Sequence, residues 1–214
     1  MPFTRNALVL RQGEFAEAIN TSLTEHRKTI KRRHSMDDKN ITILLQALSF
    51  AARKHRDQRR KDDHGSPYIN HPIAVARVLC EEAGVSDTRV LCAALLHDTV
   101  EDTDTSPEEL EAEFGPEIRS LVMEVTDDKR LPKAERKRLQ IEHASGVSYA
   151  AKLIKLADKI CNLRDVVDAP PVSWELARRQ AYFDWAQKVV EQVRGTHAGL
   201  ESMFDVAYLR RPRD

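Results

Sequence analysis

The sequence predicts an all-α fold in a single compact domain. Apolar residues recur at three- and four-residue steps along most of the chain, as on the buried face of an amphipathic helix. No segment shows sustained alternation with a period of two, and no hairpin dipeptide separates two apolar runs. With 214 residues the chain is long enough for one domain with a proper core, and it contains no internal repeat.

The domain is expected to begin at residue 37. Residues 1–36 carry scattered polar residues and a basic cluster between Arg27 and Arg33. We interpret them as an N-terminal extension, flexible or accessory, with Met36 as an alternative start of the chain. Residues 37–214 then form the folded domain.

Three helices are expected in the first part of this domain, over residues 37–61, 70–84 and 87–98. Asn70 is the expected N-cap of the second helix, and Pro72 is tolerated in its first turn. Gly84 ends that helix. Ser86 or Asp87 caps the third.

Later helices are expected over residues 106–115, 116–125, 133–143, 173–193 and 196–209. Between the break at Ser145-Gly146 and Pro170 we expect a further helix, which contains the apolar residues of the stretch 153–163. Ser106-Pro107-Glu108-Glu109 is predicted to be a capping box with proline in the first turn. Gly115 stops the helix that follows this box, and Pro116 opens the next one. Pro170-Pro171 ends the apolar run that begins near residue 153.

The stretch from Leu91 to Asp102 joins an apolar run to groups that bind metals or move protons. At roughly 100° per residue, the neighbours His97 and Asp98 diverge by less than a third of a turn, so both can reach one ion. Glu101 follows within one further turn and shares their face. Because burying such groups is costly unless they are paired or bound to metal, the stretch indicates the core of a metallohydrolase site.

Two further residues of metal-ligand type occur elsewhere in the chain. His71 stands at a predicted helix start, and Asp158 lies inside an apolar helix, where a carboxylate needs a partner. Taken alone, Asp158 is explained by a salt bridge to Lys155 or Arg164. Taken with His97 and Asp98, the two imidazoles and two carboxylates suit Mn²⁺, Fe²⁺ or Zn²⁺ and leave positions open for water and substrate.

Acidic and basic residues flank these ligand types. Glu101, with Asp102 beside it, can take a proton from a metal-bound water or orient that water. The alternative is a solvated acidic surface, which describes residues 108–113 better than it describes Glu101. Basic clusters at residues 53–61 and 129–138 can attract a phosphorylated substrate, with Arg60-Lys61 at the rim of the site.

Charge balance and cysteine use exclude several classes of function. The chain has 34 basic and 34 acidic residues, which argues against binding to nucleic acid or to a membrane surface. No stretch approaches the ~20 apolar residues of a membrane span, and no signal peptide is present. Cys80, Cys92 and Cys161 lack CxxC spacing and lie in apolar segments, so we expect buried, reduced thiols in a cytoplasmic protein. The oligomeric state does not follow from the sequence.

Three motifs in order resemble those of the RelA/SpoT-type HD hydrolase domain. They are Arg60-Lys61…Gly65-Ser-Pro-Tyr68-Ile-Asn-His71-Pro72, Ala94-Leu-Leu-His97-Asp98-Thr-Val-Glu101-Asp102-Thr and Lys155-Leu-Ala-Asp158-Lys-Ile-Cys-Asn162-Leu-Arg. With no synthetase or regulatory region after the domain, the chain is most similar to the small alarmone hydrolases, which include the metazoan SpoT homologue. The resemblance runs from about Asp37 to near the C-terminus and leaves out residues 1–36.

The resemblance implies an all-helical HD-domain fold with one bound Mn²⁺. The implied metal ligands are His71, His97, Asp98 and Asp158, and the implied catalytic acidic pair is Glu101 and Asp102. The implied substrate contacts are Arg60 and Lys61 for the nucleotide, Asn162 on the ribose side, and Lys133, Arg178 and Tyr182 as in the small members. Asp165 stands where the long bifunctional enzymes carry threonine, a departure that concerns base and ribose contacts rather than the chemistry.

The implied reaction is metal-dependent removal of the 3′-diphosphate from guanosine tetra- or pentaphosphate, (p)ppGpp, the alarmone of the stringent response. The products would be GDP or GTP and pyrophosphate. One alternative is a different nucleotide phosphohydrolase on the same site, such as an NADPH 2′-phosphatase. A second alternative is a non-catalytic module that binds an alarmone, against which the complete set of metal and acidic positions argues.

Overall fold

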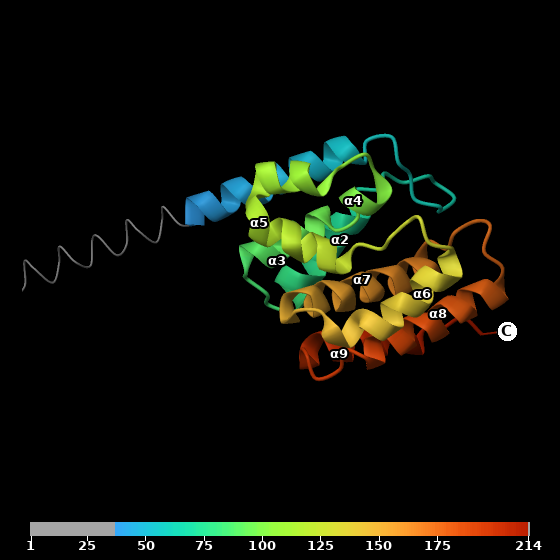
Figure 1. The fold of residues 1–214 in the computed structure, drawn as a ribbon. Coiled ribbons are helices and arrows are strands. Elements are labelled where there is room, and N and C mark those ends of the chain that lie inside the picture. The colour runs from blue at the N-terminus through green and yellow to red at the C-terminus, as the bar shows by residue number, and fades with distance from the viewer. Residues whose placement is uncertain (1–36, 214) are drawn as a thin grey trace, which may run out of the picture. The chain divides into compact units, whose positions relative to one another are not determined.

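The computed structural model describes residues 37–213, whose ribbon is drawn in Figure 1. The chain divides into two compact units after Thr42. Residues 37–42 of the first unit are helical, and the Thr42 hydroxyl donates to the Asp38 carbonyl at 2.8 Å. The extension expected at residues 1–36 lies outside the described residues, so its accessory role stays a prediction. The larger unit, from Ile43 onward, contains every predicted site residue.

This larger unit is built from helices, beginning with a helical segment at residues 43–54. The elements that follow are α2 (Asn70–Arg77), η1 (Val78–Glu82), α3 (Thr88–Leu96), α4 (Thr99–Asp102), α5 (Pro107–Val125), α6 (Lys133–His143), η2 (Ala144–Gly146), α7 (Tyr149–Asp168), α8 (Leu176–Glu191) and α9 (Ala198–Leu209). Between residues 37 and 213 there is no strand, and extended pairing is limited to an isolated bridge between Arg59 and Pro67. The all-α prediction is therefore confirmed.

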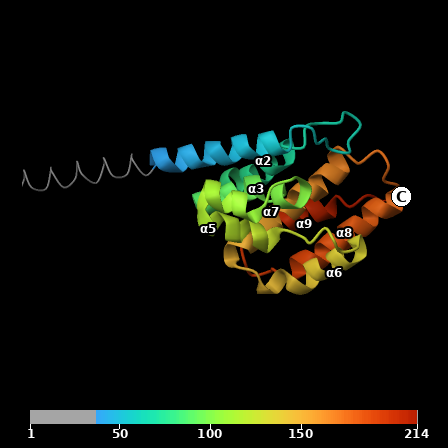
Figure 2. The same cartoon turned by 45° about the horizontal axis from the view of Figure 1, so that its top comes forward.

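Helix α7 lies at the centre of the core. It contacts α2, α3 and α5 on one side and α8 and α9 on the other, as the two views in Figures 1 and 2 show. Its side chains Ile154, Leu156, Ile160 and Leu163 are completely buried. A helix that is apolar on nearly all sides belongs in the interior. The carboxylate of Asp158 is thereby carried into the middle of the protein.

Helix α3 is the second buried element. Every residue from Val90 to Leu96 is buried, and the small side chains of Ala93 and Ala94 let α2, α5 and α7 pack closely around it. Its last turn leads directly into His97. The apolar run noted in the sequence is therefore buried, and the position of the imidazole follows from it.

The connection between the first helix and α2 differs from the prediction. The helical segment ends at residue 54 rather than at Arg60-Lys61, because His55 turns inward and its ring contacts the Gln58 side chain at 2.6 Å. Residues 55–69 form a loop. Asn70 is not the N-cap: Ile69 holds that position in a helical conformation, and Asn70 already lies in the first turn. The loop brings Arg60 and Tyr68 toward the ligand residues instead of extending a surface helix.

Helix ends elsewhere mostly follow the prediction. Asp87 and Ser106 cap α3 and α5 by accepting hydrogen bonds from the Arg89 and Glu109 amides. The Glu109 carboxylate does not complete a capping box, because it pairs with Lys54 at 2.9 Å. Gly115, at φ 82° and ψ 168°, kinks α5 where the sequence predicts a stop and a restart. Helix α7 begins at Tyr149, shortly after the break predicted at Ser145-Gly146.

The cysteine prediction is only partly right. Cys92 and Cys161 are buried free thiols, whereas Cys80 is exposed because it faces outward from the π-helical extension of α2. None of the helices in the described part of the chain is long and apolar enough to cross a membrane.

Candidate metal centre and nucleotide pocket

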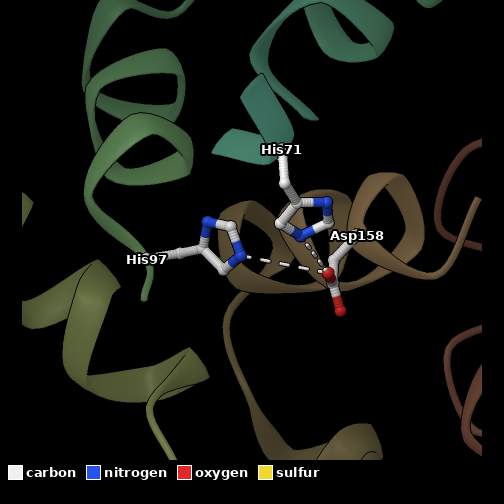
Figure 3. A group of neighbouring side chains, drawn as sticks. All are labelled: His71, His97 and Asp158. Atoms are coloured by element: carbon white, nitrogen blue, oxygen red, sulfur yellow. Dashed lines mark hydrogen bonds and ion pairs between the residues drawn. The ribbon is translucent and has the colours of Figure 1, made fainter. Parts of the chain in front are cut away.

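Three helices deliver a cluster of metal-ligand side chains to one point. His71 comes from the first turn of α2, His97 from the end of α3 and Asp158 from the middle of α7. One donor atom from each of the three lies within 4.8 Å of the other two. Figure 3 shows both imidazole rings turned toward the Asp158 carboxylate. We call these three residues the ligand cluster; two imidazoles and a carboxylate suit a divalent metal ion.

The tautomer of His97 fits a metal ligand. Its Nδ1 lies 2.7 Å from the Ala94 carbonyl oxygen, which can only accept, so Nδ1 carries the proton. In the neutral ring Nε2 then carries the lone pair, and this nitrogen is buried and has no hydrogen bond among the described residues. It lies 3.1 Å from Asp98 Oδ2 and 3.9 Å from Asp158 Oδ1. A backbone contact that fixes the tautomer of a ligating histidine is usual at metal sites.

Asp98 lies beside the ligand cluster. Its Oδ2 accepts a hydrogen bond from the Tyr68 hydroxyl at 2.6 Å, so the carboxylate is oriented by the loop before α2. Burial alone would raise its pKa, but the positive charge of the His97 and His71 rings, when they are protonated, holds the pKa well below its usual range. Asp98 therefore stays ionised where it can serve as a fourth ligand.

Asp158 is where most contacts of the site converge. Its carboxylate lies 3.1 Å from His71 Nε2, 2.8 Å from Lys159 Nζ and 2.5 Å from Asn162 Nδ2. Burial would raise its pKa, but Lys159 and His71 lower that pKa well below the ordinary value. The salt bridges from Asp158 to Lys155 or Arg164, which the sequence left open as an alternative, are not formed. Arg164 pairs with Glu82 instead, and Lys155 has no ion pair among residues 37–213.

The second nitrogen of His71 faces Asp165. Nδ1 of the buried ring lies 3.8 Å from Asp165 Oδ2, and the same carboxylate accepts a short hydrogen bond from the Arg60 guanidinium. The Arg60 side chain also stacks against the Tyr68 ring, 5.6 Å from its centroid. Asp165 thus connects a predicted nucleotide contact to a predicted metal ligand.

The predicted catalytic pair points in two directions. Glu101 accepts hydrogen bonds from the Asp127 amide and from Arg136 Nη1, both at 3.2 Å. Burial, with the charges of Asp127 and Asp98, raises the pKa of Glu101 to about 7. Asp102 instead accepts from Gln58 Nε2 at 3.0 Å and forms a short ion pair with Lys129.

Two pockets meet at the ligand cluster. The first, of about 230 Å³, is lined by all four predicted metal ligands and by Glu101, and we call it the cluster pocket. The second, of about 420 Å³, is lined by Arg60, Lys61, Asp102 and Trp174, and we call it the Arg60 pocket. Four side chains line both pockets and form the wall between them: Tyr68, His71, Asn162 and Tyr182.

The remaining predicted substrate contacts divide between these pockets. Arg60 and Lys61 line the Arg60 pocket, and Lys133 lines the cluster pocket. Arg178 lines neither; its guanidinium lies over the Trp174 ring, 4.5 Å from the centroid. Several residues at the site were not predicted as functional: Tyr68, Gln58, Asp127, Arg136, Lys137, Lys155, Lys159 and Trp185. Each meets the site through contacts that no local pattern reveals, although the motifs contain Tyr68, Lys155 and Lys159.

Comparison with known proteins finds relatives over most of the chain. The model of the HD domain family matches residues 47–183. Guanosine-3′,5′-bis(diphosphate) 3′-pyrophosphohydrolase MESH1 from Homo sapiens is 58% identical over 168 residues, covering 78% of this chain and 94% of that protein. The protein of the same name from Drosophila melanogaster is 55% identical, with the same coverage.

A solved structure shows the same fold. The structure titled "A metazoan ortholog of SpoT hydrolyzes ppGpp and plays a role in starvation responses" matches with a TM-score of 0.77 and 54% identity. The match covers 79% of this chain and 95% of that one. The ligand cluster lies inside the residues that the family model matches, and the match to these relatives spans nearly their whole length. This chain therefore belongs to the HD domain family and, within it, to the MESH1 group.

Proposed function

We propose that this chain is a metal-dependent guanosine-3′,5′-bis(diphosphate) 3′-pyrophosphohydrolase, which converts (p)ppGpp to GDP or GTP and pyrophosphate. The observation that carries the proposal is a ligand cluster flanked by a carboxylate of raised pKa and by two pockets of unequal size. The MESH1 relatives, which carry this activity in their names, support it.

We propose His71, His97, Asp98 and Asp158 as the ligands of one Mn²⁺, with Fe²⁺ or Zn²⁺ as other ions that this donor set accepts. The buried Nε2 of His97, which has no hydrogen bond among the described residues, supports the assignment, because a polar nitrogen left without a partner in the interior is costly. When bound, the ion would lower the pKa of a water and polarise a phosphoryl oxygen.

Glu101 is the proposed general base. Its raised pKa, about 7, suits proton transfer near neutral pH. The water oxygen attacks the phosphorus bonded to O3′, the bond between that phosphorus and O3′ breaks, and Glu101 takes the water's proton. O3′ leaves as the nucleotide hydroxyl after protonation, and the diphosphate with its new oxygen leaves as pyrophosphate. Asp102, held by Gln58 and Lys129, is placed on the nucleotide side to assist at O3′.

The Arg60 pocket is the proposed nucleoside site. Arg60 is fixed between Asp165 and the Tyr68 ring, which leaves its plane presented to a purine, and Lys61 adds an exposed cation for phosphate. Asn162 and Tyr182 stand at the wall toward the ligand cluster, where the ribose must pass.

The test is to incubate the purified protein with guanosine tetraphosphate and Mn²⁺ and to identify the products by ³¹P NMR. Pyrophosphate and GDP are expected in equal amounts. Release of orthophosphate from NADPH at a higher kcat/KM would instead assign the site to a 2′-phosphatase. Binding of guanosine tetraphosphate without turnover, in protein that contains stoichiometric metal, would show a sensor and refute the enzyme.

A further inference from the structure

The cluster pocket is lined by several cationic side chains, and only some of them form ion pairs with its carboxylates. Five cationic side chains line it: Lys133, Arg136, Lys137, Lys155 and Lys159. Two of these are paired, Lys159 with Asp158 at 2.8 Å and Arg136 with Glu101 at 3.2 Å. Lys133, Lys137 and Lys155 form no ion pair within the part of the chain that the structure describes.

Aromatic rings rather than acids hold part of this cationic wall. The Lys137 ammonium lies over the rings of Trp185 and Tyr182, at 4.5 Å and 5.4 Å from their centroids. The Trp185 indole N–H donates to the Lys137 carbonyl at 3.0 Å, which ties α8 to α6. A ring face attracts a cation but accepts no ordinary hydrogen bond from it, so the ammonium protons of Lys137 remain available to a ligand.

Lys133, Lys137 and Lys155 lose hydration, and neighbouring cations repel each of them. Burial, followed by the charges of Lys133 and Lys159, lowers the pKa of Lys137 to about 8. Burial, followed by the charge of Lys159, lowers the pKa of Lys155, although the carboxylates of Asp127, Asp158 and Glu101 offset part of this. Such a group is costly without a counter-charge, and an anion in the pocket would remove much of that cost.

We propose that Lys137 and Lys155, together with Lys133, form a subsite for the 3′-diphosphate of the substrate, and for inorganic pyrophosphate once the reaction is complete. Of the three, only Lys133 is a substrate contact that the resemblance to the small alarmone hydrolases implies. The inference rests on the proposed function, since it divides one substrate between the two pockets.

The arrangement of the pockets matches a substrate divided in this way. The nucleoside, the larger part, fits the pocket of about 420 Å³, and the diphosphate fits the pocket of about 230 Å³. A molecule crossing the wall beside His71 and Asn162 places its O3′–phosphorus bond next to the ligand cluster and Glu101. The diphosphate then lies against the lysines and away from Arg60.

The experiment measures binding of each product separately by calorimetry, on the Mn²⁺-loaded full-length protein. Lys137→Met and Lys155→Met keep an unbranched stem but remove the ammonium. Each is expected to weaken the binding of inorganic pyrophosphate about tenfold or more, as for loss of one charge-assisted hydrogen bond, and to leave GDP binding unchanged. Arg60→Ala should do the reverse. Lys152→Met, on the same helix as Lys155 but lining neither pocket, is the matched control.

Equal pyrophosphate affinity in the parent and both lysine variants would overturn the subsite. Equal weakening of pyrophosphate and GDP would also overturn it, because that pattern shows a general loss of positive field. Thermal unfolding confirms that each variant is folded; if Lys137→Met is not, Lys155→Met alone decides the question. Calorimetry needs no turnover, so a protein that binds pyrophosphate through these lysines but leaves guanosine tetraphosphate intact would refute the proposed function and keep the anion subsite.

Discussion

At the scale of single residues, the site depends on polar contacts between side chains that lie far apart in the sequence. Asp158 contacts His71, which lies 87 residues earlier in the sequence, and Arg60 contacts Asp165 at a separation of 105. The residue types His71, His97, Asp98 and Asp158 could be predicted because each interrupts or borders an apolar run. Three residues that contact the site carboxylates could not be predicted: Tyr68 on Asp98, Gln58 on Asp102 and Arg136 on Glu101. Long-range contacts of this kind leave no periodic signal in the sequence.

Replacing Asp158 tests the metal assignment. Asp158→Ala should weaken Mn²⁺ binding by more than about 100-fold, beyond what removal of a residue that only supports a ligand costs. It should also destabilise the fold by about 3–5 kcal/mol, because buried Lys159 loses its carboxylate partner. Metal content by atomic absorption and urea unfolding give the two readouts. A variant that binds Mn²⁺ as tightly as the parent shows that Asp158 is no ligand. Asp158→Asn, which preserves volume, is the control for packing.

Replacing Glu101 separates chemistry from binding. Glu101→Gln should lower kcat by ~10²–10⁴-fold while metal content and GDP affinity stay at parental values. The base must be ionised, and burial raises its pKa to about 7, so parental kcat/KM should rise with pH through an acidic limb. A bound cation favours the carboxylate, which puts the limb at or below pH 7. A pH–rate profile of both proteins checks this. Persistence of the same limb in Glu101→Gln would assign it to another group.

At the scale of elements, loops and helix ends decide where the site groups stand. The buried helices α3 and α7 could be predicted from their apolar patterns, and so could the caps at Asp87 and Ser106. The early end of the first helix could not, because it depends on His55 and Gln58 turning toward Tyr68 and Asp102. Tertiary contacts of this kind override helix propensity.

The kink in α5 offers a test at this scale. Gly115 has φ 82° and ψ 168°, a conformation nearly restricted to glycine. Gly115→Ala should therefore destabilise the protein by about 1–3 kcal/mol although no atom lies within 4 Å of the added carbon. Gly146→Ala, where the carbon is equally free and φ is not positive, should change stability by no more than about 0.5 kcal/mol. The urea midpoints of the two variants provide the comparison. An equal loss of stability in both would show that the positive φ of Gly115 is not the cause.

At the scale of the whole molecule, the family match falls within the larger unit, which begins at Ile43. The family model begins at residue 47, and the MESH1 relatives reach 94–98% of their own length within 78–82% of this chain. The all-helical class was predictable because periodicity persists over the full domain. The two adjoining pockets were not, since their walls combine residues from α2, α6, α7 and α8.

Removing the N-terminal extension tests the domain boundary. A chain starting at Met36 should retain parental kcat/KM and metal content, because no predicted site residue precedes Arg60. Steady-state kinetics on protein matched for thermal unfolding temperature provides the comparison. A loss of more than about tenfold in kcat/KM at unchanged stability would mean that residues 1–35 support the site.

The wall between the pockets also has a kinetic consequence. Each pocket has an exposed residue at its own rim, Lys133 in one and Lys61 in the other. With the substrate divided as proposed, we expect each product to leave past its own rim residue, so that release follows no compulsory order. Random release makes GDP and pyrophosphate each competitive against substrate, and it allows both to occupy the enzyme together. A cell rich in pyrophosphate would slow this enzyme without blocking the exit of the nucleotide.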